Sequence, residues 1–158
     1  MSIVIRQMSA QDKSEIVYLL ETIPQFKPIE ITIAKELVDE YLSKGTNSGY
    51  HILVAEENHV LVGYICYGPT PLTESTWDIY WEAVIPARQG FGIGSSLINE
   101  AETNIRLLGG KLALIETSST PEYEKTRKFY SSHGYCQVSC IPDFYAPGDH
   151  RITYYKKL

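Results

Sequence analysis

The chain has 158 residues, of which 44% are hydrophobic and 21% charged, and its formal net charge is −5 at pH 7. This length suits one domain, spanning residues 1–158, and the composition is that of a globular protein rather than a disordered or fibrous one. A net negative charge repels nucleic acid and anionic lipid at long range, so we expect neither as a partner.

The N-terminal third predicts one strand and two helices. Alternating Ile3 and Ile5 predict the strand, and Ser9 with an acid three residues later is a capping signal for a first helix that runs to Leu20. Apolar residues at helical spacing over 34–42 predict the second helix.

The middle of the chain predicts three strands. Residues 50–68 have the pattern of two strands joined by a tight turn at 57–59. Aromatic and β-branched residues over 76–86 predict a third, central strand. A glycine-rich stretch, residues 90–94, follows this strand at once.

The last third predicts two helices and three strands. In chain order they are a helix (97–108), a strand (111–117), a helix (121–133) and two strands (135–141 and 151–157), the last two joined by a loop over 142–150. Antiparallel neighbours come first and a strand-helix-strand crossover lies in the middle. We therefore predict an α/β (α+β) fold with one mixed, mostly antiparallel sheet of about seven strands, flanked on both faces by about four helices.

Two features of the chain predict a cytoplasmic protein. Residues 1–15 lack the apolar core of a signal peptide, and no stretch approaches the roughly 20 apolar residues of a membrane span. The 3 cysteines, Cys66, Cys136 and Cys140, cannot all pair within one chain, which argues against the disulfide framework of a secreted protein.

Three glycines, Gly90, Gly92 and Gly94, stand at every second position between the predicted strand and helix. Glycine lets a ligand come close to the backbone, and a helix start offers unpaired amide hydrogens and the positive end of the helix dipole. Arg88 and Gln89 stand where they can close over such a turn. The sequence therefore predicts a pyrophosphate site. The alternative is a turn that needs glycine only for its backbone angles.

The spacing differs from those of two common phosphate-binding motifs. A dinucleotide-binding turn needs G-x-G-x-x-G after an early strand, whereas this chain has G-x-G-x-G after a hairpin. A nucleotide-hydrolysing P-loop needs a lysine after its last glycine, and here Ser95 follows Gly94. We exclude both.

Two motifs in the right order resemble those of the GNAT family of N-acetyltransferases. The first, Val-x-Pro-x-x-Gln/Arg-x-x-Gly-x-Gly/Ala, is matched by Val84, Pro86, Gln89, Gly92 and Gly94. The second, a helix with Phe-Tyr followed by Gly-Tyr, is matched by Phe129, Tyr130, Gly134 and Tyr135. Tyr123 departs from the pattern, since many members have an asparagine there that contacts pantetheine. The element order is also similar to that of the family across nearly all of the chain, which implies the GNAT fold.

The resemblance implies a site for acetyl-CoA. The backbone of Val84 would meet the thioester carbonyl, and Tyr130 would lie near the CoA sulfur. The pantetheine arm would lie where the strands 78–86 and 111–117 diverge. The pyrophosphate would be held by the turn and the helix start, which comprise Arg88, Gln89, Gly90, Phe91, Gly92, Ile93, Gly94 and Ser95.

Acetyl transfer requires a general base, because an alkyl ammonium with a pKa near 10.4 is only about 1 part in 2,500 neutral at pH 7. Asp78, Glu82 and Val84 share one face of their strand by two-residue alternation if no bulge intervenes. Glu82 is the first candidate because it lies nearest the acetyl end. Asp78 and Glu116, on the neighbouring strand, are the others. Each of these acids has an alternative role in binding a cationic substrate.

Tyr130 is the candidate partner of the departing thiolate, which needs a proton or a strong hydrogen bond. A phenol with a pKa near 10 is a weaker acid than a thiol near 8.5, so full transfer costs about 2 kcal/mol, whereas a hydrogen bond carries no such cost. The Val84 amide can hold the oxyanion. Without the motif, Tyr130 would be interpreted as a buried aromatic residue beside Phe129.

These features predict a transferase that moves an acetyl group from acetyl-CoA directly to a primary amine of a small molecule or peptide. The alternatives are transfer of another acyl group, transfer to oxygen, and a non-catalytic CoA-binding or sensing module. No metal is expected, because His133, Cys136 and Cys140 run from a helix end into a strand without a fourth ligand. An exposed edge strand would allow a homodimer. The aromatic and acidic segment 143–150 is a candidate border of the acceptor site.

Overall fold

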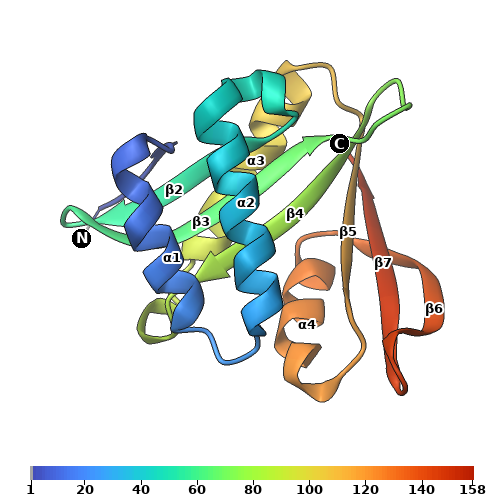
Figure 1. The fold of residues 1–158 in the computed structure, drawn as a ribbon. Coiled ribbons are helices and arrows are strands. Elements are labelled where there is room, and N and C mark those ends of the chain that lie inside the picture. The colour runs from blue at the N-terminus through green and yellow to red at the C-terminus, as the bar shows by residue number, and fades with distance from the viewer. Residues whose placement is uncertain (1) are drawn as a thin grey trace.

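The structure, a computed structural model, describes residues 2–158 as a seven-stranded sheet with helices against both faces (Figure 1). The strands are β1 (Ile3–Gln7), β2 (His51–Glu57), β3 (Val60–Pro69), β4 (Thr76–Val84), β5 (Leu112–Ser118), β6 (Cys136–Ala146) and β7 (Asp149–Lys157). The helices are α1 (Lys13–Glu21), α2 (Pro28–Lys44), α3 (Ile93–Leu107) and α4 (Glu124–Ser132). Short 3-10 turns are η1 (Ala10–Asp12), η2 (Gly45–Ser48), η3 (Pro86–Arg88) and η4 (Pro121–Tyr123).

The sheet is mixed and mostly antiparallel, as predicted. Its strand order is β1-β2-β3-β4-β5-β7-β6, and the β4–β5 pair alone is parallel among the described strands. The predicted β2–β3 hairpin is present, with Asn58 (φ 51°) and His59 (φ 64°) forming its two-residue turn. Positive φ at both positions matches the twist of antiparallel strands.

Two apolar clusters lie on opposite faces of the sheet. Side chains of α1 and α2, among them Ile16 and Val38, pack on one face with alternate residues of β2 and β3. Side chains of α3 and Tyr130 of α4 pack on the other face with residues of β4 and β5. The prediction of helices on both faces is therefore confirmed.

The prediction of a loop over 142–150 is wrong. β6 continues to Ala146 and β7 begins at Asp149, so a tight turn joins them. The pairing shifts register between Ile141 and Ala146, and Asp143 has a φ of 54°. All of β6 is exposed, so the alternation that marks a half-buried strand is absent from this segment. Irregular edge strands tolerate proline, which the sequence otherwise presents as a loop signal.

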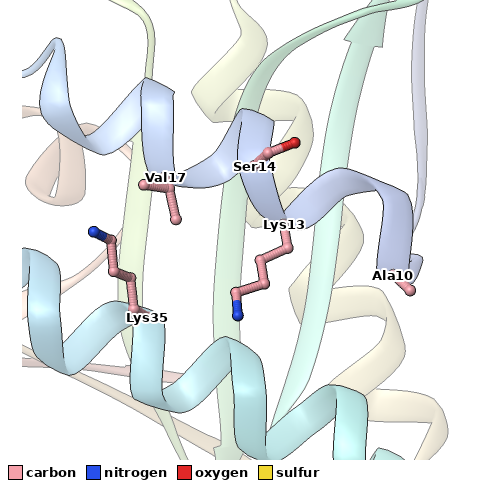
Figure 2. Close-up of a pocket in the computed structure, with 5 residues that line it drawn as sticks. All are labelled: Ala10, Lys13, Ser14, Val17 and Lys35. Carbon is pink, nitrogen blue, oxygen red and sulfur yellow. The ribbon is translucent and has the colours of Figure 1, made fainter.

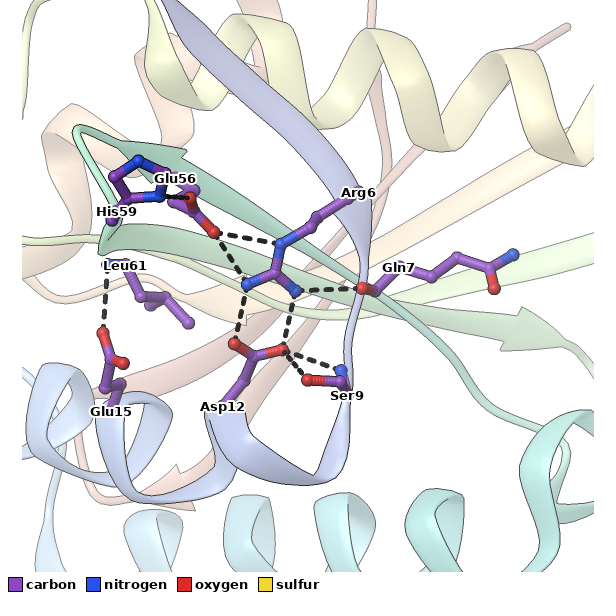
Figure 3. Close-up of polar contacts among 8 residues, drawn as sticks. All are labelled: Arg6, Gln7, Ser9, Asp12, Glu15, Glu56, His59 and Leu61. Atoms are coloured by element: carbon purple, nitrogen blue, oxygen red, sulfur yellow. Dashed lines mark hydrogen bonds and ion pairs between the residues drawn. The ribbon is translucent and has the colours of Figure 1, made fainter.

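Polar contacts fix the N-terminal elements to the sheet (Figure 3). The Arg6 guanidinium donates two hydrogen bonds of 2.8 Å to Asp12 and also pairs with Glu56 of β2. The Ser9 N–H donates to Asp12 at 2.7 Å, so the pair predicted as a capping signal is in contact. The helix α2 begins at Pro28, before the predicted residue 34, and the Lys27 N–H donates to Glu30 at 2.7 Å.

Within residues 2–158 no helix is both long and apolar enough to span a membrane.

Candidate active site

The strands β4 and β5 are paired over only part of their length. Residues Thr76 to Ile79 pair with Leu112 to Ile115, whereas β4 continues to Val84 and β5 to Ser118. Figure 1 shows the two strands diverging toward their carboxyl ends. The divergence predicted for the pantetheine arm therefore lies between the last residues of β4 and β5.

The free edge of β4 presents backbone donors to this opening. The Ile85 N–H donates to the Val62 carbonyl of β3 at 2.9 Å. Because N–H groups alternate between the two edges of a strand, those of Val84 and Glu82 point away from β3 and toward β5. The opening is thus lined by two amide donors.

A bulge in β4 reverses the alternation of its side chains. Cys66 pairs with Trp81 and the next residue of β3 pairs with Ile79, so Tyr80 is the extra residue. Ile79 belongs to the cluster on the α3 face, whereas Trp81 packs against the cluster under α1 and α2. An inserted residue moves every later side chain to the other face.

The bulge separates two of the candidate acids. Asp78 precedes it and alternates with Ile79, so it points to the α1 and α2 face. Glu82 follows it and points to the α3 face with Val84. The prediction that Asp78 and Glu82 share a face is therefore wrong.

The Glu82 carboxyl is enclosed. Both of its oxygens are buried and neither has a hydrogen-bond partner. A Cβ added at Gly94 would lie 3.2 Å from Glu82 Oε1 and 3.2 Å from the Phe129 ring. Burial raises the pKa of Glu82 to about 8, because the charged form is poorly solvated there.

Tyr130 lies on the same face as Glu82. Its side chain is buried in the α3-face cluster, and its ring packs edge-on against Phe129 at 5.5 Å between centroids. Burial raises the pKa of Tyr130 well above its usual value, and the Glu82 carboxyl contributes to this shift. The motif residue and the first candidate acid are therefore neighbours.

Asp78 is half-buried on the face that α1 and α2 cover. Its carboxylate accepts a hydrogen bond of 2.8 Å from the Thr70 hydroxyl. Tyr80, which is 37% exposed, packs edge-on against Tyr50 at 5.5 Å. Burial raises the pKa of Tyr80, with Asp78 as the second cause.

The glycine turn leads directly into α3. Gly90 and Gly92 both have a φ of 82°, and a Cβ at either position would meet no atom within 4 Å. Glycine is needed there for its backbone angles, and the space above the turn is clear. The Ser96 N–H donates to the Gly92 carbonyl at 3.0 Å, which is the first hydrogen bond of the helix. The N–H groups that come before Ser96 in this turn therefore have no partner within the helix. This geometry fits a phosphate group.

The side chains around the turn have partners that the sequence did not indicate. Arg88 pairs with Glu57 and its guanidinium lies 4.6 Å from the centre of the Phe91 ring. Gln89 Nε2 donates to the Val84 carbonyl at 3.0 Å. These contacts hold the turn against the end of β4 and against the β2–β3 hairpin.

A histidine joins the two helices that border the site. His133 Nε2 lies 2.9 Å from Ser95 Oγ, and His133 Nδ1 lies 2.8 Å from the Phe129 carbonyl. Sequence reasoning weighed His133 only as a metal ligand or a buried residue and missed this link. Among residues 2–158 no group of three or more His, Cys, Asp and Glu side chains could hold a metal ion.

Acids and tyrosines from several elements gather near the ends of β5 and α4. Burial, Glu30 and Asp149 raise the pKa of Tyr123 to about 12. Burial and Glu116 raise the pKa of Tyr145. Glu116 alternates with the buried Ile115 and therefore lies on the same face as Asp78. The sequence did not indicate that Glu30 and Asp149 lie near this site, because they come from α2 and β7 and only the fold brings them together.

A surface depression between α1 and α2 contains none of the candidate site residues (Figure 2). It is lined by Ala10, Lys13, Ser14, Val17 and Lys35. Both lysines are already paired, Lys13 with Asp39 and Lys35 with Glu21. We assign no function to it.

Comparisons with known proteins identify the same fold and the same motifs. The sequence profile of a domain described as "Acetyltransferase (GNAT) domain" matches residues 48–137. A crystal structure of a GNAT-family protein from Desulfovibrio desulfuricans is 40% identical, with a TM-score of 0.96 and 99% of each chain covered. Comparison with curated protein sequences finds no relative.

More distant structures share the fold alone. The ribosomal-protein-S18-alanine N-acetyltransferase of Escherichia coli is 14% identical, with a TM-score of 0.79 and coverage of 99% of this chain and 94% of that one. An aminoglycoside 6'-N-acetyltransferase complexed with coenzyme A is 20% identical, with a TM-score of 0.77 and coverage of 98% and 96%.

Proposed function

The chain belongs to the GNAT family of N-acetyltransferases, and from this premise we propose that it transfers the acetyl group of acetyl-CoA directly to a primary amine. One observation carries the proposal: β4 and β5 diverge between the glycine turn and Tyr130. A turn that can bind phosphate and a phenol therefore border the same opening. The coenzyme A bound to the aminoglycoside acetyltransferase supports acetyl-CoA as cosubstrate.

Each part of acetyl-CoA has a matching group in this site. The amides from Gly92 to Ser95 would bind the pyrophosphate, with Arg88 and Phe91 beside it. The N–H groups of Glu82 and Val84 would meet the pantetheine arm and the thioester carbonyl. Tyr130 would donate a hydrogen bond to the departing sulfur.

We propose Asp78, rather than Glu82, as the general base. The amine arrives from solvent, and the half-buried Asp78 lies beside the exposed Tyr80, whereas both oxygens of the Glu82 carboxyl are enclosed. Val84, whose N–H would meet the thioester carbonyl, lies about 20 Å along the strand from Asp78 at the usual rise per residue, so the proton would travel through a chain of waters. A base on one face and Tyr130 on the other would place the two proton transfers on opposite sides of β4.

The acceptor that fits this site best is a cationic amine. The side of the opening that faces Asp78 also carries Glu116, and Glu30 and Asp149 lie close by. Carboxylates at the entrance would attract an ammonium group and hold a second one, if present, away from the reacting nitrogen. The small-molecule and peptide acceptors named for the relatives are both amines.

The test is release of free thiol from acetyl-CoA in the presence of diamines, amino acids, aminoglycosides and peptides, together with the thermal shift caused by CoA. We expect stabilisation by CoA and fastest release with a cationic amine. Stabilisation without turnover on any acceptor would favour the non-catalytic CoA-binding module. Failure of CoA to stabilise the protein would refute both.

A further inference from the structure

The Glu82 carboxyl is a buried polar group for which the protein provides no partner. Its two oxygens are shielded from solvent between β4, the start of α3 at Gly94 and the Phe129 ring of α4. Buried polar groups are nearly always hydrogen-bonded, and an exception in a native fold calls for an explanation such as a catalytic role. Glu82 belongs to the part of β4 that diverges from β5, so its carboxyl can serve the reaction at that opening.

Two titratable groups of the α3-face cluster, Tyr130 and Tyr135, lie on the same side of the sheet as Glu82. Tyr130 of α4 and Tyr135, which precedes β6, both have pKa values raised by burial and, among smaller causes, by the Glu82 carboxyl. The Tyr135 hydroxyl already donates to Glu102 at 3.0 Å, and Glu102 is also paired with Lys156. Tyr130 is therefore the group with which Glu82 can exchange a proton.

We propose that Glu82 is the proton source behind Tyr130, which it recharges as the CoA thiolate departs; this inference rests on the proposed function. The Tyr130 hydroxyl contacts the sulfur and Glu82 acts through it. Neither Glu82 oxygen has a hydrogen-bond partner in this structure, so the hydrogen bond to Tyr130 would form in the acetyl-CoA complex, where catalytic hydrogen bonds often tighten.

The step balances in protons and electrons. After the amine nitrogen has bonded to the acetyl carbonyl carbon, the carbon–sulfur bond breaks, and sulfur keeps the electron pair and takes the Tyr130 proton. The phenolate takes the Glu82 proton, and the Glu82 carboxylate regains a proton from solvent after CoA leaves. The two protons lost by the ammonium acceptor leave through Asp78 to solvent, so one proton is released per turnover.

Acid strengths favour this arrangement. Burial raises the pKa of Glu82 to about 8, so most of the carboxyl is protonated at pH 7. Burial raises the pKa of Tyr130 above the ordinary phenol value near 10, so it is a poor final donor to a thiolate whose conjugate acid has a pKa near 8.5, whereas a carboxyl near 8 is a matched one. Glu82 thereby removes the unfavourable step that Tyr130 alone would face.

The test is the pH dependence of kcat with a double-mutant cycle on Glu82→Gln and Tyr130→Phe. Wild-type kcat should fall above about pH 8, where Glu82 loses its proton. Glu82→Gln should lower kcat about 10-fold and remove this alkaline limb, with little change in the KM for acetyl-CoA. The double variant should be no slower than Tyr130→Phe, because Glu82 acts through Tyr130. The exposed Glu36→Gln is the matched control and should keep the wild-type profile.

Infrared spectroscopy of the wild-type protein provides a readout that needs no variant. A protonated carboxyl absorption should be present at pH 7 and titrate away together with the alkaline limb of kcat. Additive effects of the two substitutions, a limb that persists in Glu82→Gln, or a carboxyl that titrates apart from kcat would overturn the inference. Absence of acetyl transfer from wild-type protein to any amine would instead refute the proposed function.

Discussion

Glu82 should make the folded protein less stable as the pH rises. Its carboxyl has a pKa of about 8 in the folded protein and 4.5 in a solvated reference state, so the folded state binds the proton more tightly. Folding therefore takes up a proton between these values. The stabilisation is fully present below about pH 4.5 and is lost as the pH rises toward about 8.

Urea unfolding of the wild-type protein and of Glu82→Gln between pH 5 and 8 measures this effect. Glutamine keeps the shape of the side chain and cannot ionise. We expect the wild-type free energy of unfolding to fall with pH by a few kcal/mol more than that of Glu82→Gln. Parallel curves for the two proteins would show that Glu82 is not protonated at neutral pH.

Asp78 and Glu116 should respond differently to neutralisation. Asp78→Asn removes the proposed base and should lower kcat about 100-fold. Glu116→Gln removes a negative charge from the entrance, together with its ion pair to Arg151, and should raise the KM for a cationic amine by several-fold at low salt, with kcat nearly unchanged. Steady-state kinetics of the two variants with one diamine makes the comparison. An equal loss of kcat in both variants would contradict the assignment of Asp78 as the base and of Glu116 as a charge at the entrance.

The sequence identified these acids but could not place them correctly relative to one another. Two-residue alternation predicts that Asp78 and Glu82 point the same way. The bulge at Tyr80 reverses this, and it arises from how β4 pairs with Cys66 and its neighbour in β3. Register between strands is a property of the assembled sheet, so no local pattern in β4 signals it.

At the scale of elements, Gly94 allows α3 to approach β4 and α4. A Cβ there would lie 3.2 Å from both the Glu82 carboxyl and the Phe129 ring, which is closer than most side chains tolerate. We expect Gly94→Ala to destabilise the fold by about 1–3 kcal/mol and to weaken CoA binding, because it moves the start of α3.

Unfolding and CoA thermal shifts measured on Gly94→Ala and on Ser96→Ala test this role. Ser96 is exposed on the same turn of α3 and serves as the control. Gly90 and Gly92 differ from Gly94, since their need for glycine comes from positive φ rather than from close packing. Unchanged stability and CoA affinity in Gly94→Ala would show that the helix start can shift without cost.

The order of elements was predictable because apolar periodicity, caps and the two-residue hairpin turn are local signals. The end of β6 was not predictable in this way. Its residues are exposed on both faces, and Pro142 and Gly148 are typical of a loop, yet pairing with β7 extends the strand to Ala146. Similarly, the contact of His133 with Ser95 joins residues 38 positions apart and has no local signature.

At the scale of the whole molecule, the sheet divides where the β4–β5 pairing ends at Ile79 and Ile115. The division brings the glycine turn, Tyr130 and the enclosed Glu82 to one opening, and it leaves Asp78 and Glu116 on the opposite face. The two motifs carry the prediction that acetyl-CoA binds at the opening, whereas the separation of the acids into two faces came only from the folded sheet.

The most direct test of acetyl transfer is the mass of an amine acceptor after incubation with acetyl-CoA and either the wild-type protein or Tyr130→Phe. If the protein transfers acetyl groups as proposed, the wild-type protein should add one acetyl group to a cationic amine, with one thiol released per product. Tyr130→Phe should form the same product about 10- to 100-fold more slowly, with nearly unchanged CoA affinity. An acceptor that stays unmodified, or a product formed equally fast by Tyr130→Phe, would contradict it.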